Sequence, residues 1–397
     1  MTQPSRLQFP DHFLWGAATA AHQVEGNNIN NDWWTREHNG GPRVDEPSGD
    51  ACDSYHRFRE DIALLAEAGF NTYRFSLEWS RIEPEPGCFS RAQIDHYCRM
   101  VDACHEFGLA PVVTLQHFTL PKWLAVEGGW LAPDAAALFG RFTEIALSVV
   151  AEGVEWVCTI NEPNMVAKIE GGEPTYPITS SAHTHLDKRV SDTLVLAHRR
   201  SREVLDDVPA IKSGWTIASQ AFSPVPGSEP IAREYGYPRE DFFLEAARGD
   251  DFVGVQAYSR TRIGPDGPLP VPANAETTQM GWEYFPPALG IGVRHAWKVT
   301  AGVPIMVTEN GIATADDARR ISYTHGALTG LHEAINDGIK VLGYVHWSAL
   351  DNYEWGSYKP TFGLIAVNRE NFARTVKPSA SWLGAVAKAN TLEPAES

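Results

Sequence analysis

The sequence predicts an α/β fold, a single (β/α)8 TIM barrel formed by the 397-residue chain. Strand-like runs of apolar and β-branched residues alternate with amphipathic stretches, which is typical of parallel βαβ units. Eight such runs occur, and eight is the number of strands that closes a barrel. The competing fold is an open, doubly wound sheet. No GxGxxG follows a strand and no Walker motif is present, so the barrel is favoured.

The eight expected strands are short apolar runs, each six to ten residues long, bounded by turn-forming or polar residues. In chain order they are Phe13–Ala18, Thr72–Trp79, Ala110–His117, Trp156–Asn161, Ile211–Ala218, Asp251–Tyr258, Pro304–Glu309 and Val341–Leu350. The expected helices between them are Tyr55–Ala68, Ile94–Phe107, Asp134–Ala151, Ser191–Leu205, Gly290–Lys298 and Ser322–Asp337. No low-complexity linker interrupts this alternation. We therefore expect one catalytic domain over residues 1–397, with short irregular tails.

The net charge of the chain limits the kinds of partner that it can bind. Fifty acidic and 33 basic side chains give a formal net charge of −17. This charge argues against nucleic acid and anionic membrane surfaces as partners, and favours neutral or cationic small molecules. The oligomeric state cannot be inferred from it.

The N-terminus and the cysteines indicate a cytoplasmic protein. The first residues lack a basic segment followed by an apolar core, so we expect no signal peptide, and no apolar run is long enough to span a membrane. The cysteines are odd in number and form no CxxC pair, which predicts reduced thiols and no metal site. They are Cys52, Cys88, Cys98, Cys104 and Cys158.

Two glutamates stand at the ends of expected strands. Glu162 follows Trp156–Asn161, and Glu309 ends Pro304–Glu309. The carboxyl ends of barrel strands carry the catalytic groups, and two carboxyls brought together there can hydrolyse a glycosidic bond. The simpler interpretation is that each carboxylate caps the helix that follows it.

Amide, imidazole, carboxylate and indole side chains follow most of the other strands. This mixture suits a sugar, because hydroxyls need polar partners while the apolar face of the ring stacks on tryptophan. Any single one of these residues could instead make one local hydrogen bond at the rim. Because such groups follow most of the strands, their combined presence favours a sugar site.

Five stretches of the chain form recognisable motifs, including Thr-Ile-Asn-Glu-Pro, Thr-Glu-Asn-Gly and Asp-Asn-Tyr-Glu-Trp. They occupy residues 13–26, 73–82, 159–163, 308–311 and 346–355. In these stretches and in their order the chain resembles glycoside hydrolase family 1, the β-glucosidase family. The resemblance implies a retaining exo-β-glycosidase on a barrel, without metal or organic cofactor.

The resemblance also implies roles for individual residues. Glu162 would be the acid/base and Glu309 the nucleophile, and we expect donors around Glu309 to lower its pKa while Glu162 stays protonated. The remaining catalytic residues would be Arg74, Asn161 and Tyr258. The sugar would be bound by Gln23, His117, Trp347, Glu354 and Trp355.

Several residues depart from the family pattern. Phe118 replaces the usual Trp, and Gln256 and Ala257 replace the usual Asn-Tyr before Tyr258. The loop after Asn-Glu-Pro and the stretch 222–251 are short, so the preference for a leaving group cannot be transferred.

Two features narrow the expected substrate. Glu354 stands where the phospho-glycosidase branch has Ser, so an unphosphorylated sugar is favoured. Retention of Glu162 favours O-glycosides over thioglucosides. The open alternatives are a transglycosidase with the same site and a non-catalytic sugar-binding barrel.

Overall fold

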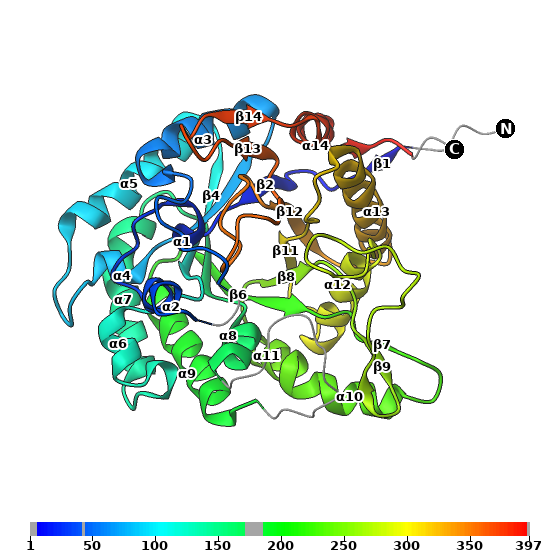
Figure 1. Cartoon of the computed structure of the whole chain (residues 1–397), viewed down its shortest axis with the longest axis horizontal. Helices are drawn as coiled ribbons and strands as arrows, with labels where there is room; N and C mark the ends of the chain where they lie inside the picture. Colours follow the sequence, from blue (N-terminus) through cyan, green and yellow to red (C-terminus); the bar gives the residue numbers. More distant parts are fainter. Residues whose placement is uncertain (1–5, 42–43, 171–185, 395–397) are drawn as a thin grey trace.

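The structure is a computed structural model that describes residues 6–41, 44–170 and 186–394. Eight parallel strands close into a barrel in the order β11-β12-β2-β3-β4-β5-β6-β8 (Figure 1). The strands are β2 (Leu14–Ala18), β3 (Thr72–Ser76), β4 (Ala110–Gln116), β5 (Trp156–Asn161), β6 (Lys212–Ser219), β8 (Val253–Ala257), β11 (Ile305–Glu309) and β12 (Val341–Trp347). All eight expected strands are therefore present, and the predicted barrel is confirmed.

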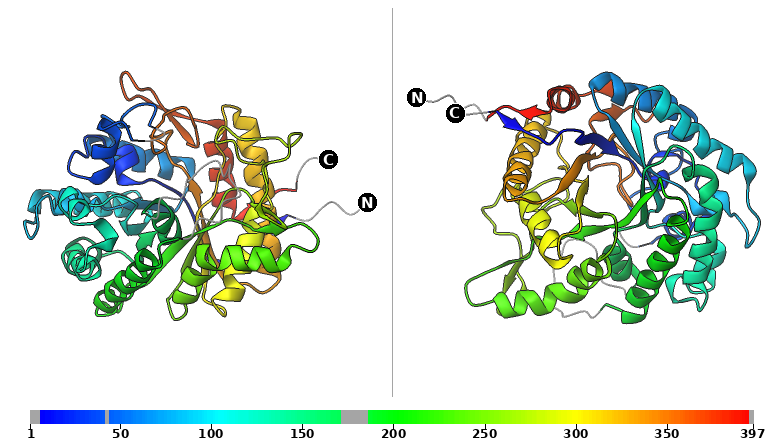
Figure 2. Two further views of the ribbon diagram at one scale, coloured as in Figure 1. Left: turned by 60° about the horizontal axis from the view of Figure 1, so that its bottom comes forward. Right: turned by 180° about the vertical axis from the view of Figure 1, so that it is seen from behind.

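Helices surround the barrel, as Figure 2 shows from behind. The six expected helices are α3 (Ser54–Ala68), α5 (Arg91–Glu106), α7 (Ala135–Val150), α9 (Lys188–Leu205), α12 (Ala288–Val299) and α13 (Asp317–Asn336). Two of them begin at side-chain caps that the sequence carries. Asp187 accepts the amide of Arg189 at α9, and Asp316 accepts the amides of Ala318 and Arg319 at α13.

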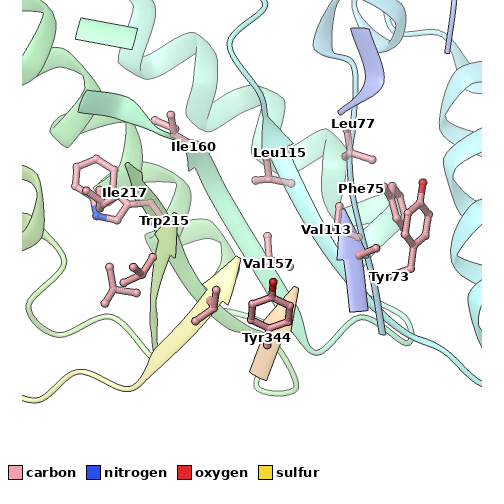
Figure 3. Packing of buried hydrophobic residues seen from close by; sticks show 14 of the residues in the cluster. Tyr73, Phe75, Leu77, Val113, Leu115, Val157, Ile160, Trp215, Ile217 and Tyr344 are labelled. Carbon is pink, nitrogen blue, oxygen red and sulfur yellow. The ribbon is translucent and has the colours of Figure 1, made fainter. Parts of the chain in front are cut away.

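The core lies between the strands and the surrounding helices. Successive side chains of a strand point to opposite faces, so alternate residues face the helices. Tyr73, Phe75 and Leu77 do so beside Val113 and Leu115 (Figure 3). A separate, smaller apolar cluster on the inner side of the barrel strands consists of Val112, Cys158, Phe252 and Met306. The barrel is thus a packed support whose carboxyl-terminal rim is left for polar groups.

Two strands end three residues earlier than the sequence predicts. β3 ends at Ser76, and the short helix α4 (Trp79–Ile82) begins where the sequence predicted continued strand. β12 ends at Trp347 rather than at residue 350. In both cases apolar side chains continue beyond the end of the strand, so hydrophobicity alone overestimates its length.

The remaining elements, most of them short, were not predicted from the sequence. The additional helices are α1 (Ala21–Val24), α2 (Asp32–His38), α6 (Lys122–Val126), α8 (Pro163–Glu170), α10 (Glu229–Gly236), α11 (Asp241–Ala246) and α14 (Pro378–Ala389), with 3-10 turns at Gly129–Leu131 and Tyr237–Arg239. The short strands are β7 (Ser223–Pro224), β9 (Arg262–Gly264), β10 (Gly267–Pro268), β13 (Ile365–Val367) and β14 (Arg374–Val376), together with β1 (Leu7–Gln8) and β15 (Thr391–Leu392). β1 pairs with β15, which brings the two described ends of the chain together (Figure 1).

All five cysteines are free thiols. Across the described ranges, no helix combines the length and the apolar character needed to cross a bilayer.

Candidate active site

Both glutamates lie at the carboxyl-terminal rim and are buried. Glu309 is the last residue of β11, and Glu162 follows β5 with a φ of +45°. A positive φ is costly for a residue with a side chain and is common at functional sites. No backbone amide of the described chain donates to either carboxyl group. This arrangement contradicts the simple interpretation that the two glutamates cap helices.

Glu309 is held by two donors from different strands. Arg74 of β3 donates through Nη1 to Glu309 Oε1 over 2.7 Å, and both side chains are buried. The hydroxyl of Tyr258, directly after β8, donates to Oε2 over 2.6 Å. Burial raises the pKa of Tyr258 well above its ordinary value, so the phenol keeps its proton. Each carboxylate oxygen of Glu309 therefore has its own donor.

Asn161 is the centre of a second network. Its Oδ1 accepts from Arg74 Nη2 at 2.5 Å, from Gln256 Nε2 at 2.8 Å and from Thr216 Oγ1 at 3.0 Å. The amide at Gln256, a departure from the family pattern, thus reaches the same network. Thr216 was missed because a threonine inside a strand carries no distinctive signal.

The orientation of Asn161 determines the proton position on His117. With Oδ1 engaged by donors, Nδ2 must donate to His117 Nε2, 3.2 Å away, so the imidazole proton is on Nδ1. Burial, with the nearby Arg74, lowers the pKa of His117 well below its ordinary value, and the ring is neutral. Nδ1 is buried and has no hydrogen-bond partner within the described ranges. It is a donor suited to a sugar hydroxyl.

The two carboxyl groups have different surroundings. Burial, and then the negative charge of Glu309, raise the pKa of Glu162 well above its ordinary value. Burial also raises the pKa of Glu309, and Arg74 and Tyr258 offset only part of this rise. The two donors lower the pKa of Glu309, as the sequence predicts, but burial raises it by more, so the net shift is upward. The proton still belongs on Glu162, which has the negative neighbour and lacks the donors.

The loop after β12 forms the opposite side of the site. Trp347 Nε1 donates to Glu354 Oε1 over 3.1 Å. Gln23 of α1 donates to the Tyr353 carbonyl over 2.8 Å, and its Oε1 is buried without a partner in the described part of the chain. Burial raises the pKa of Glu354 to about 8. Near neutrality this carboxyl group can therefore donate a hydrogen bond as well as accept one.

Aromatic rings line this side. His117 stacks on Trp347 at an interplanar angle of 23° and on Trp355 at 15°. Phe118 meets Trp355 edge-on, with ring centroids 5.0 Å apart. The replacement of Trp by Phe118 thus keeps the aromatic contact and removes only the indole donor.

A further pair behind this wall was not predicted. His22 stacks on Trp355 at 15°, and its Nε2 lies 2.7 Å from Glu37 Oε1. The amide of Asn31 faces His22 Nδ1 at 2.9 Å. Both His22 and Glu37 are buried. The sequence showed a histidine near a strand end and gave no sign of its partner.

Gly311 explains how the ends of β11 and β12 meet. A Cβ at this position would lie 2.0 Å from the carbonyl oxygen of Trp347, so only glycine fits. The close approach places Glu309 and Trp347 on neighbouring strands at the same rim. Among the residues whose positions are described, no three His, Cys, Asp or Glu side chains gather in a way that could hold a metal ion.

A closed parallel barrel with two differently held carboxyl groups at its carboxyl-terminal rim is typical of glycoside hydrolases. The sequence profile of Glycosyl hydrolase family 1 matches residues 5–235 and 257–392, and the chain belongs to this family. Beta-glucosidase A of Acetivibrio thermocellus is 31% identical, over 97% of this chain and 99% of that protein. The bifunctional beta-D-glucosidase/beta-D-fucosidase of Bifidobacterium breve is 30% identical, over 94% and 97%.

Solved structures agree with these relatives. A crystal structure of a beta-glycosidase is 44% identical, with a TM-score of 0.88 over 98% of this chain and 99% of that chain. The family 1 β-glucosidase of Thermotoga maritima is 28% identical, with a TM-score of 0.90 over 98% and 100%.

Proposed function

We propose that the chain is a retaining exo-β-glycosidase that hydrolyses unphosphorylated β-D-glucosides and also accepts β-D-galactosides or β-D-fucosides. The observation that carries this proposal is the unequal surroundings of the two carboxyl groups. Glu309 has a donor on each oxygen, whereas Glu162 has none in the described chain and faces a negative neighbour. These are the surroundings that a nucleophile and an acid require.

In the first step Glu309 attacks the anomeric carbon while Glu162 transfers its proton to the glycosidic oxygen, and the leaving group departs. A covalent glycosyl-enzyme forms with inverted configuration. In the second step Glu162, now ionised, takes a proton from water, and the oxygen of this water displaces Glu309. The second inversion returns the β configuration.

The remaining site residues bind and orient the sugar in this proposal. Arg74 and Tyr258 hold the Glu309 carboxylate, and Asn161 contacts the 2-hydroxyl, where the bond strengthens in the transition state. The glycone contacts are Gln23, His117, Glu354 and Trp355, with Trp347 as the platform under the ring. The Bifidobacterium breve relative acts on glucosides and fucosides by its name, which supports tolerance at position 6 of the sugar.

We also propose that the chain acts as one catalytic domain in the cytoplasm, with a small-molecule substrate and no nucleic-acid or membrane partner. The net charge of −17 supports the last point, because it repels polyanions.

Release of p-nitrophenol from its β-D-glucoside tests the activity, and NMR of the first-formed sugar tests the mechanism. We expect the β anomer first. An α anomer would exclude retention, and no release at any pH would favour the non-catalytic barrel. A transglycosidase would instead transfer the glucosyl group to added sugar faster than to water.

A further inference from the structure

The backbone connection between β8 and β11 stops at the candidate nucleophile. The register of the two strands shifts between Val307 and Glu309, and the last backbone pair joins Glu309 to Gln256. Tyr258, which donates to the Glu309 carboxylate, therefore lies beyond the last pair. No backbone amide of the described residues donates to the Tyr258 carbonyl, so another group has to satisfy this acceptor.

Two buried side chains continue the connection where the backbone pairing stops. Asn310 Nδ2 donates to the carbonyl of Ala257 over 2.6 Å. The Tyr323 hydroxyl donates to the next carbonyl, that of Tyr258, also over 2.6 Å. Asn310 Nδ2 in addition donates to the Tyr323 oxygen at 3.3 Å, which joins the two side chains. Two consecutive carbonyls at the end of β8 are thus tied to the residue that follows the nucleophile.

Tyr323 reaches this point from α13, which packs on the outside of the barrel beside α12 (Figure 1). Its side chain is fully buried, and its ring meets Tyr284 edge-on with the centroids 5.6 Å apart. Burial raises the pKa of Tyr323, so the hydroxyl keeps the proton that it donates. Because the ring is closely packed, the hydroxyl is held in one place.

The main chain at Tyr258 determines where its phenol lies relative to Glu309. The phenol donates to Glu309 Oε2 over 2.6 Å. The ring packs edge-on against Trp282 and Phe362, so it moves with its surroundings and with its own main chain. Hydrogen bonds weaken as their distance and angle depart from the optimum, so a displaced carbonyl would weaken this bond. Tyr323 is thus placed to act on Glu309 through Tyr258.

We propose that Tyr323 is a positioning residue for the hydrolysis, which holds Tyr258 where its hydroxyl keeps Glu309 oriented for attack. The inference rests on the proposed function, because it assigns a role in the attack by the nucleophile. It adds to that function a residue outside the barrel strands that contributes through the main chain of a neighbour.

The same contact should influence the pH dependence of activity. Burial raises the pKa of Glu309, and Arg74 and Tyr258 offset part of this rise. A weaker bond from Tyr258 should therefore raise the pKa of Glu309 further and move the acidic limb of the pH profile to higher pH. The other titratable groups around Glu309 are unchanged when only Tyr323 is replaced. They are Arg74 of β3, Cys158 of β5, Glu162 after β5 and Glu354 after β12.

The test is Tyr323→Phe, which removes one oxygen atom and keeps the packed ring. With p-nitrophenyl β-D-glucoside we expect kcat to fall roughly fivefold, the effect of about one hydrogen bond, while KM changes less than about twofold. The acidic limb of kcat/KM should move up by about half a pH unit. The control is Tyr55→Phe, which removes a hydroxyl that joins α3 to Gln93 of α5 over 3.0 Å. It should keep the wild-type kcat and pH profile.

A double-mutant cycle separates positioning from general destabilisation. If Tyr323 acts through the Tyr258 hydroxyl, adding Tyr323→Phe to Tyr258→Phe should lower kcat by less than about twofold further. Additive losses, or a lower melting temperature with unchanged kcat and pH profile, would overturn the inference. If Tyr323→Phe does not fold, Asn310→Ala takes its place, because it removes the donor to Ala257. The same shift of the acidic limb is expected, and an unshifted limb would count against the proposal.

A measurement without turnover distinguishes this inference from the proposed function. Failure of wild type to hydrolyse aryl β-D-glucosides would contradict the proposed function. The pKa of Glu309 can still be measured by 13C NMR of protein labelled at its glutamate carboxyl groups, with the signal assigned from Glu309→Gln. We expect a higher pKa of Glu309 in Tyr323→Phe than in wild type. Equal values in the two proteins would overturn the positioning role.

Discussion

Arg74 and Glu309 form a buried ion pair across the barrel, with 2.7 Å between Nη1 and Oε1. Their strands, β3 and β11, are separated by β2 and β12 in the closed sheet. The pair therefore exists only because the barrel closes, and the same guanidinium also donates to Asn161. One arginine thus links the candidate nucleophile to the residue expected to contact the 2-hydroxyl.

The role of Glu309 is tested by Glu309→Gly. We expect kcat to fall by more than about 1,000-fold, because a missing nucleophile costs many orders of magnitude. Azide or formate should then restore turnover and give an α-configured product, as detected by NMR. Glu229→Gly, at an exposed position, is the control. Rescue that yields a β product would assign the nucleophile elsewhere.

The role of Glu162 is tested through the leaving group. For Glu162→Ala we expect a loss of about 100-fold or more on alkyl β-glucosides, the usual contribution of a general acid. 2,4-Dinitrophenyl β-glucoside needs little protonation, so its kcat/KM should change far less. Equal losses on both substrates would contradict the acid assignment.

Glu354 should determine the substrate class. Glu354→Ser should lose roughly 30-fold in kcat/KM for p-nitrophenyl β-glucoside, about 2 kcal/mol for hydrogen bonds to a buried carboxyl group. The loss should be smaller for the β-fucoside, which has no 6-hydroxyl. Wild type should reject the glucoside 6-phosphate, because a phosphate needs positive charge around it. Glu354 supplies none, and no described cation is hydrogen-bonded or ion-paired to it. A preference of wild type for the phosphorylated substrate would contradict the assignment to unphosphorylated β-glucosides.

The same residue predicts a pH dependence of stability. Burial raises the pKa of Glu354 from 4.5 to about 8 in the folded chain. As the pH rises through this window the unfolded chain releases the proton first, so wild type loses stability. Glu354→Gln does not titrate, and its melting temperature relative to wild type should therefore increase from pH 4.5 to about 8 and then level off. Glu370→Gln, at an exposed position, should show no such trend.

Gln256 should act through Asn161. Gln256→Met keeps the side-chain length and removes the 2.8 Å bond to Asn161 Oδ1. We expect kcat/KM to fall roughly fivefold for aryl β-glucosides, the effect of about one hydrogen bond. Aryl 2-deoxy-β-glucosides lack the hydroxyl that Asn161 is expected to bind, so their loss should be smaller. The same loss on both substrates would contradict a role of Gln256 through the contact of Asn161 with the 2-hydroxyl.

The sequence by itself determined the barrel and the candidate site. Strand and helix periodicity are local, so β5 was predicted to the residue and all eight barrel strands were found. The glutamates were found for the same reason, since each directly follows or ends an apolar run. The motifs shared with the family then gave each side chain its expected role.

Only the tertiary structure decided how these groups meet. The contact of Gln256 with Asn161 depends on barrel closure, and the pair of His22 with Glu37 depends on a loop, and no local period encodes either. The donors lower the pKa of Glu309, as predicted, but the larger rise caused by burial was not predicted from the sequence. The donors to Glu309 can be predicted from the sequence. The effect of burial on its pKa depends on how the whole protein packs around the carboxyl group and excludes water.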